Sequence, residues 1–209
     1  MEKVNSSEVL IVNSETNVQN EKSKFGLALL GTVAASAVAL VAITTPFVVP
    51  AFRKVCLPFV PATPKQIKNI LSALPNKHSV IKVAEIGSGD GRVAIEIAKN
   101  TRSKVVGLEL NPWLVWYSRY KSFSQGINRK TCSFLIADLW KINYSSYDRV
   151  VVFAVQEMMK DLQTKLVEEM KPGSEIVACR FNLPDLEPKE VIGEGIDTVW
   201  VYEVKDNKK

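Results

Sequence analysis

The sequence predicts an α/β fold with a parallel sheet, preceded by one separate apolar helix. Three observations predict this arrangement. Apolar runs typical of buried strands alternate with segments whose apolar residues recur at helical spacing. Glycines 87, 89 and 91 directly follow the first of these runs and open a helical pattern, and residues 25–45 contain no charged side chain. With 209 residues, 46% of them hydrophobic, the chain can hold one domain of ordinary size and additional segments.

Residues 1–24 are polar, and we expect them to be disordered. They contain acidic residues and no arginine, so they do not resemble a cleaved transit peptide. As a helix, residues 25–45 would be about 31 Å long, which matches the roughly 30 Å core of a bilayer. We therefore predict a single membrane anchor. The alternatives are a signal peptide, for which no cleavage site is clear, and a core helix, although the sheet pattern that follows is complete without one.

Residues 46–64 form a proline-rich connector, which should be stiff because each proline fixes its own φ and restricts the preceding residue. Thr63 and Pro64 are a typical N-cap and first residue for a helix over 65–74. That helix is either a simple packing helix or a lid over a binding site. We predict a globular domain over 65–204 and a frayed tail over 205–209.

The loop after the first strand has the spacing G-x-G-x-G, with an acid two residues before it. Glycines allow a tight turn and let a ligand lie close to the backbone, and the N–H groups of the next helix favour electron-rich groups. The spacing differs from the G-x-G-x-x-G that holds a dinucleotide pyrophosphate, which argues against a nicotinamide oxidoreductase. The candidate binding residues are Glu85, Gly87, Gly89, Asp90 and Gly91.

Two further acids follow predicted strands. The strand over 104–109 ends in Glu109, where a carboxylate can accept both hydroxyls of a ribose. The strand over 132–137 is followed by Asp138, placed to accept a hydrogen of an adenine amino group. An ordinary α/β domain explains the glycine loop alone equally well. Loop and two acids together resemble the S-adenosylmethionine-dependent methyltransferases of the seven-stranded class, which implies S-adenosyl-L-methionine as cofactor.

Asn111 and Pro112 form an N-cap and first residue for a helix that extends to Gly126. If Glu109 binds a ribose, both residues lie beside it. Trp140, two residues after the adenine acid, could cap the adenine or form a wall of a substrate channel. The helix also carries an aromatic stripe, which we expect to face the core: Trp113, Trp116, Tyr120 and Phe123.

The remaining pattern completes the sheet. A continuous apolar run over 149–155 is typical of a central parallel strand, a helix is expected over 156–170, and further strands over 175–181 and 198–204. The segment between the last two strands is short, so we expect the usual final hairpin and helix of this class to be trimmed.

Composition excludes other functions. The formal net charge is +5, but the basic residues are scattered and no RNA-binding motif is present, so we expect no nucleic-acid partner. The cysteines at 56, 132 and 179 lack C-x-x-C spacing, which predicts a reducing compartment and no metal site.

Several long segments resemble one family. They run over 46–63, 109–120, 138–141 and 193–200, and they are similar to the mitochondrial ATP synthase c-subunit lysine N-methyltransferases. The resemblance implies that the substrate is a lysine of the ATP synthase c subunit, that methylation supports ATP synthase assembly and respiration, and that the protein is anchored in a mitochondrial membrane, expected to be the inner one. The sister family methylates the adenine nucleotide translocase. That substrate, or a membrane-tethered assembly scaffold without activity, remains the alternative.

Overall fold

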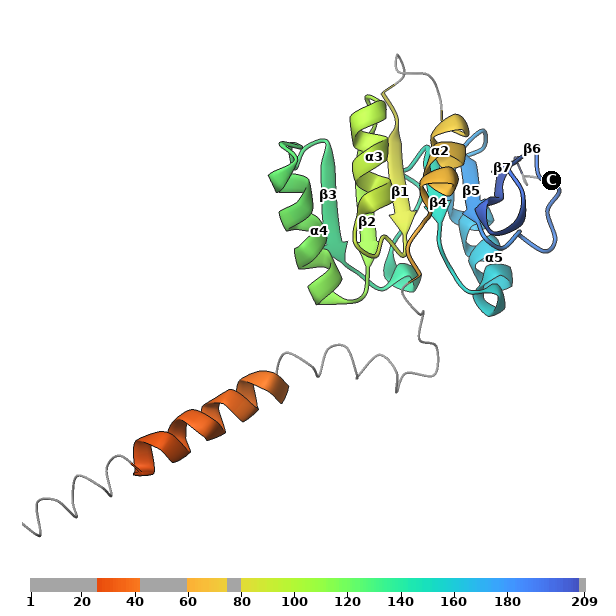
Figure 1. Cartoon of the computed structure of the whole chain (residues 1–209). Helices are drawn as coiled ribbons and strands as arrows, with labels where there is room; N and C mark the ends of the chain where they lie inside the picture. Colours follow the sequence, from red (N-terminus) through yellow and green to blue (C-terminus); the bar gives the residue numbers. More distant parts are fainter. Residues whose placement is uncertain (1–25, 42–59, 75–79, 207–209) are drawn as a thin grey trace, which may run out of the picture. The chain divides into compact units, whose positions relative to one another are not determined.

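The computed structural model describes residues 26–41, 60–74 and 80–206 (Figure 1). The chain divides into two compact units, residues 1–53 and residues 54–209. In the first unit, residues 26–41 form a helix whose apolar side chains are exposed, Leu27 and Leu30 among them. The described part of the chain contains no helix long and apolar enough to span a bilayer. The predicted anchor over 25–45 is therefore not confirmed, and its ends lie outside the described residues, as does most of the connector.

The second unit is built on one sheet with the strand order β3-β2-β1-β4-β5-β7-β6. The first five strands are parallel, while β7 is antiparallel to both β5 and β6. This confirms the predicted seven-stranded α/β fold. The strands are β1 (Lys82–Ile86), β2 (Lys104–Glu109), β3 (Cys132–Ile136), β4 (Arg149–Val152), β5 (Glu175–Cys179), β6 (Glu190–Ile192) and β7 (Val199–Glu203).

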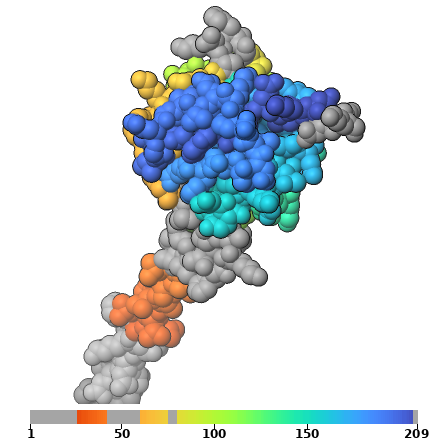
Figure 2. Space-filling view, turned by 90° about the vertical axis from the view of Figure 1, so that its right-hand side faces the viewer, coloured from red at the N-terminus to blue at the C-terminus, as the bar shows by residue number. Residues whose placement is uncertain are grey.

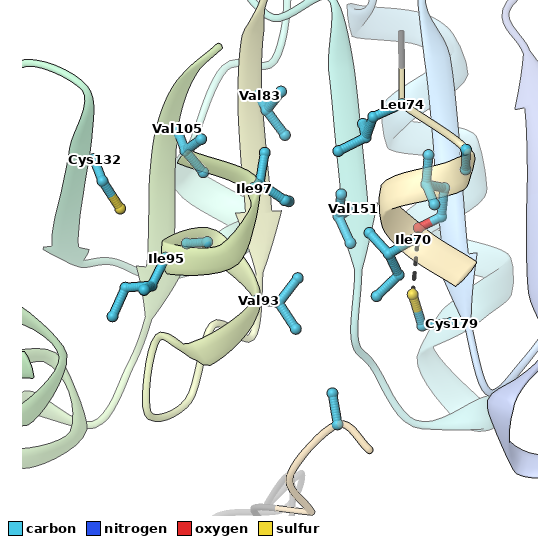
Figure 3. Close-up of a cluster of buried hydrophobic side chains, with 14 of the residues drawn as sticks. Ile70, Leu74, Val83, Val93, Ile95, Ile97, Val105, Cys132, Val151 and Cys179 are labelled. Carbon is cyan, nitrogen blue, oxygen red and sulfur yellow. Dashed lines mark hydrogen bonds between the residues drawn. The ribbon is translucent and has the colours of Figure 1, made fainter. Parts of the chain in front are cut away.

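Helices cover both faces of this sheet (Figure 1). Because successive residues of a strand point to opposite faces, β1 sends Val83 into one hydrophobic cluster and Ala84 into the other. The helices α2 (Pro64–Ser72), α3 (Arg92–Asn100) and α4 (Pro112–Ser124) contribute to the first cluster, part of which Figure 3 shows. The helix α5 (Met159–Glu169) contributes to the second. Short 3-10 turns are η2 (Leu139–Lys141), η3 (Gln156–Met158) and η4 (Gly195–Asp197).

The expectation that the final hairpin is trimmed was wrong. Strands β6 and β7 form a short antiparallel hairpin, closed by the turn η4. Only the preceding helix is missing, since residues 180–189 contain none. A three-residue strand such as β6 carries too little hydrophobic periodicity to be found in the sequence.

Helix α2 is fixed to this hairpin. Its Gln66 and Asn69 side-chain amides donate to the carbonyls of Ile196 and Asp197, each at 2.9 Å. Figure 2 shows α2 at the side of the blue region that contains this part of the chain. On its other side, Ile70 is fully buried against the sheet. These contacts favour a packing helix over a lid.

The expectation that the aromatic stripe of α4 faces the core was also wrong. Trp116, Tyr120 and Phe123 are 56%, 69% and 81% exposed. The helix instead packs through the buried residues Val115, Ser118 and Ser122. Only small side chains fit there, because α4 lies directly against the glycine loop. The hydrophobic pattern predicted the helix correctly and its orientation incorrectly.

Candidate functional site

The predicted site residues lie at the carboxyl ends of three neighbouring parallel strands or in the segments that follow them. Ile86 of β1 is paired with Leu108 of β2, and Glu109 of β2 with Ile136 of β3. The glycine loop, Glu109 and the segment after β3 therefore leave the sheet at one edge. In open α/β sheets, ligands bind in the crevice at this edge.

The glycine loop lies close to the neighbouring strands. Gly87 has φ +72°, and a Cβ there would lie 2.4 Å from the carbonyl oxygen of Phe153, which follows β4. The N–H groups of Gly87 and Ser88 both donate to the Leu108 carbonyl of β2, at 2.9 and 3.1 Å. A side chain at position 87 would separate the loop from both strands, so glycine is required by space as well as by conformation.

Gly91 ends the loop and caps α3. Its φ is +75°, and a Cβ would lie 2.8 Å from the ring of Phe134 and from Cβ of Ser118. The Ser118 hydroxyl in turn donates to the Gly89 carbonyl at 3.0 Å. Gly89 also has a positive φ, of 52°. The loop is thus pressed between β3 and α4.

Glu85 lies beneath the loop. Its side chain is almost completely buried, and its Oε2 accepts the backbone N–H of Ala94 in the first turn of α3 at 2.9 Å. Burial raises the pKa of the Glu85 carboxyl well above its ordinary value, although the Ala94 hydrogen bond opposes this shift. The hydrogen bond to Ala94 holds the start of α3 in place, and the start of α3 in turn positions the end of the glycine loop.

The Asp90 carboxylate forms salt bridges with two basic side chains. The guanidinium of Arg92 lies 2.8 Å and the ammonium of Lys121 lies 3.1 Å from Oδ2 of Asp90. These hydrogen bonds lower the pKa of Asp90, against the effect of its burial. The Arg92 guanidinium also donates to the Ala62 carbonyl at 3.2 Å. Asp90 therefore connects the loop to α4 and to the segment before α2.

Glu109 is the acid that contacts the loop directly. Its Oε2 accepts the N–H of Gly89 at 3.0 Å, and its Oε1 accepts the N–H of Asn111 at 2.8 Å. The carboxylate is partly exposed. Each oxygen has a second lone pair, so the group can still accept two hydroxyl hydrogens. Two backbone donors thus fix the orientation of an acid that remains accessible.

Asn111, Pro112, Asp138 and Trp140 occupy the expected turns. The Asn111 side chain caps α4 by accepting the Trp113 N–H at 3.0 Å, with Pro112 as the first helical residue. Asp138 caps η2 in the same way by accepting the Trp140 N–H at 3.1 Å, and its side chain is partly exposed. Trp140 is 41% exposed. None of these contacts prevents a ligand from approaching.

Arg180 is a residue that sequence reasoning missed. It follows β5 at the same edge and has φ +71°, the one positive φ at a non-glycine residue in the described part of the chain. Its guanidinium donates to the Pro61 carbonyl at 3.0 Å. Positive φ at a side-chain-bearing residue is uncommon and often marks a functional region. Arginine is not a residue type that indicates a positive φ, so only the structure identifies Arg180 as a residue with this conformation.

The described residues contain no cluster of side chains that could hold a metal ion. A hollow of about 630 Å³ lies between α2, α3 and α4. It is lined by none of the predicted site residues, so it is separate from the edge of the sheet described above.

The strand order of the sheet, the glycine loop and the Glu109 carboxylate together define a Rossmann-like fold of the class I methyltransferase type. A model of the ANTKMT methyltransferase domain matches residues 85–190. A model of the N-terminal domain of the ATP synthase c-subunit lysine N-methyltransferases matches residues 22–53. The chain belongs to the family of ATP synthase c-subunit lysine N-methyltransferases, as the resemblance predicted.

Relatives of known name are similar over most of the chain. The human ATP synthase c-subunit lysine N-methyltransferase is 48% identical, over 97% of this chain and 84% of that protein. The mouse adenine nucleotide translocase lysine N-methyltransferase is 35% identical, over 85% of this chain and 78% of that protein. The structure of an RNA methyltransferase from Salinibacter ruber in complex with S-adenosyl-L-homocysteine superimposes with a TM-score of 0.67, at 23% identity, over 72% of this chain and 97% of that one.

Proposed function

We propose that this protein transfers a methyl group from S-adenosyl-L-methionine to a lysine of the ATP synthase c subunit. The observation that supports this most directly is the partly exposed Glu109 carboxylate, which the loop residue Gly89 and the helix cap Asn111 hold at the carboxyl edge of the sheet. The choice of the c subunit as the substrate rests on membership of the family.

The residues fit this cofactor. Gly87 and Gly91 keep side chains out of the loop, and their Cβ atoms would collide with Phe153 and Phe134. In the proposed complex Glu109 accepts the ribose hydroxyls and Asp138 accepts the adenine amino group, while Gly89 brings the backbone close to the ligand. Glu85 and Asp90 act indirectly, since both are bonded to α3 residues and hold the loop in place. S-adenosyl-L-methionine carries its methyl group on a sulfonium, which makes that group electrophilic.

The protein must then supply an uncharged lysine amine in line with the methyl group. Asn111, Pro112 and Trp140 are the residues we assign to the substrate channel, because they lie in the turns that directly follow the proposed ribose and adenine acids. Enclosing the amine among carbonyl and aromatic groups lowers its pKa, since burial disfavours the charged form. Holding amine and methyl at near-attack distance supplies much of the rate enhancement, and no dedicated base is required.

Two other functions differ in testable ways. Methylation of the adenine nucleotide translocase is less well supported, because identity to the relative with that name is 35% against 48%. A scaffold without activity has no need for the glycine loop and Glu109 in their observed geometry. Absence of S-adenosyl-L-methionine binding in calorimetry would favour the scaffold.

We further propose that the chain is anchored in the inner mitochondrial membrane through residues 25–45. Support comes from the uncharged sequence and from the exposed apolar side chains of the helix over 26–41. Anchoring would confine enzyme and c subunit to one plane and raise their effective concentration. Resistance of the protein to alkaline carbonate extraction from isolated mitochondria tests this.

The decisive experiment for the activity uses the full chain, S-adenosyl-L-methionine and purified c subunit, analysed by intact mass. We expect the c subunit to gain the mass of one or more methyl groups, on a lysine that fragmentation can locate. Translocase offered in the same reaction should stay unmodified. Methylation of the translocase alone would replace the proposed substrate, and binding of cofactor without any transfer would leave the scaffold as the better description.

A further inference from the structure

Helix α4 exposes its aromatic side chains and packs against the domain through smaller ones. At 3.6 residues per turn, its five aromatic side chains fall within an arc of about 120° that faces away from the domain. The opposite side, which packs, carries Ser118, Ser122 and Val115. A surface helix of a globular protein normally has the reverse arrangement. The members of this aromatic face are Trp113, Trp116, Tyr117, Tyr120 and Phe123.

The aromatic face is large and exposed. Four of its side chains are more than half exposed, from 52% for Tyr117 to 81% for Phe123. Trp113 packs edge-on against Trp116, with ring centroids 5.4 Å apart, so the face is ordered rather than a set of isolated rings. Contiguous exposed apolar patches of this kind mark interaction surfaces.

The chain segment that contains the face carries charge of one sign only. From Leu110 to Ala137 the chain contains no acidic residue and four basic ones. Two of these, Arg119 and Lys121, are bonded within the domain, to the Phe134 carbonyl and to Asp90.

The other two, Arg129 and Lys130, are exposed in the turn after α4. Neither forms an ion pair with a carboxylate among the residues the structure describes. An anionic surface would complement this turn.

From these observations we infer that the α4 face docks on the surface of an anionic lipid bilayer. Trp and Tyr have an apolar body and a polar tip, and they are enriched at the membrane–water interface for that reason. A convex helix with outward aromatic rings and a basic rim matches the interfacial helices that lie in the plane of a membrane. A protein partner would need a matching groove, whereas a bilayer needs none.

This docking would orient the candidate site. Helix α4 begins directly after Asn111, whose N–H binds Glu109, and its inner side contacts Gly89 through Ser118. One helix diameter, about 10 Å, therefore separates the membrane surface from the glycine loop. The carboxyl edge of the sheet would then lie close to substrates presented at that surface. The inference concerns the location of the domain and holds whichever membrane-associated substrate the enzyme uses.

The test must separate α4 from the apolar N-terminal helix, which could bind vesicles by itself. We would place an environment-sensitive fluorophore (NBD) at Phe123→Cys in the full chain, with Cys56→Ser to avoid a second label. Cys132 and Cys179 are buried. The matched control carries the label at Ile196→Cys, which is 71% exposed on η4. Both proteins are mixed with vesicles of phosphatidylcholine containing cardiolipin, and with phosphatidylcholine alone.

We expect the emission from position 123 to rise and shift to the blue with cardiolipin vesicles, while position 196 stays unchanged. Arg129→Ser combined with Lys130→Ser should reduce this change, and so should high salt. If the labelled protein binds the vesicles without any change at position 123, or if phosphatidylcholine alone gives the same change, the inference fails. A change at position 123 caused only by detergent-solubilised c subunit would assign the face to a protein and also overturn it.

Discussion

The Oε2 atom of Glu109, the last residue of β2, and the backbone nitrogen of Gly89, in the loop between β1 and α3, lie 3.0 Å apart at the carboxyl edge of the sheet. This hydrogen bond links the glycine loop to the proposed ribose acid, so a displacement of either residue would break it. It also makes Glu109 the most informative residue to change.

We predict that Glu109→Ala weakens cofactor binding by roughly 2–4 kcal/mol, because two hydrogen bonds to a charged acceptor are lost. Calorimetry with S-adenosyl-L-homocysteine measures this. The control is Glu187→Ala, an exposed acid in the loop between β5 and β6, which should bind normally. Near-normal affinity of the Glu109 variant with an unchanged melting temperature would refute the proposed role.

Gly87→Ala should destabilise the fold more than Gly126→Ala. Both positions have a positive φ, +72° and +70°, but only at 87 would the new Cβ collide with a backbone oxygen. The shared backbone strain costs about 1 kcal/mol, and the collision adds about 1–3 kcal/mol. Urea unfolding of the two variants compares them directly. Equal losses would show that the loop can shift away from β4 at little cost.

Glu85→Gln should flatten the dependence of stability on pH. The folded-state pKa of Glu85 is raised above its ordinary value, so the folded protein keeps a proton that the unfolded chain releases as the pH rises above about 4.5. Native stability should therefore fall with rising pH until the folded-state pKa is passed. Glutamine retains an acceptor for Ala94 and does not titrate, so this fall should disappear.

Thermal melting from pH 5 to pH 8 provides the measurement. Glu96→Gln, a change at a partly exposed glutamate of the same helix, serves as the control, and this variant should keep the fall in stability with rising pH. Parallel curves for wild type and Glu85→Gln would mean that burial does not hold the proton on this carboxyl.

Arg180→Ala should be less stable than Arg180→Gly by about 1 kcal/mol, because alanine keeps the left-handed backbone strain that glycine relieves. Both variants lose the hydrogen bond to Pro61, so their difference isolates the backbone. Guanidinium chloride unfolding of the pair checks this. A less stable glycine variant would indicate that position 180 is not strained.

Deleting residues 1–52 should leave cofactor affinity unchanged, since every proposed cofactor residue lies beyond position 84. Methylation of the c subunit in cells should nevertheless fall sharply, and intact-mass analysis would detect this. An unrelated matrix-targeting sequence on the truncated chain separates delivery from tethering: full rescue indicates delivery alone, and partial rescue indicates tethering. Normal methylation by the truncated, untargeted protein would contradict the anchor.

The fold could be predicted from the sequence because its parallel strands are buried on both faces. Strands that are buried on both faces need continuous apolar runs such as that over 149–155, and such runs can be recognised in the amino-acid sequence. The glycine loop, Glu109 and Asp138 could be predicted for a related reason: each lies at the end of a strand or just after it, and parallel strands end at one edge. Local order in the chain therefore fixes their approximate place.

The tertiary structure alone decided which side of α4 faces the domain. Hydrophobicity alone predicted that the aromatic residues of α4 face the core, but the space between α4 and Gly91 admits only serine-sized side chains. It likewise decided that Glu85 caps α3, that Asp90 is held by Arg92 and Lys121, and that Arg180 adopts a positive φ. These properties depend on distances between segments far apart in the sequence, and no pattern of residue types records such distances.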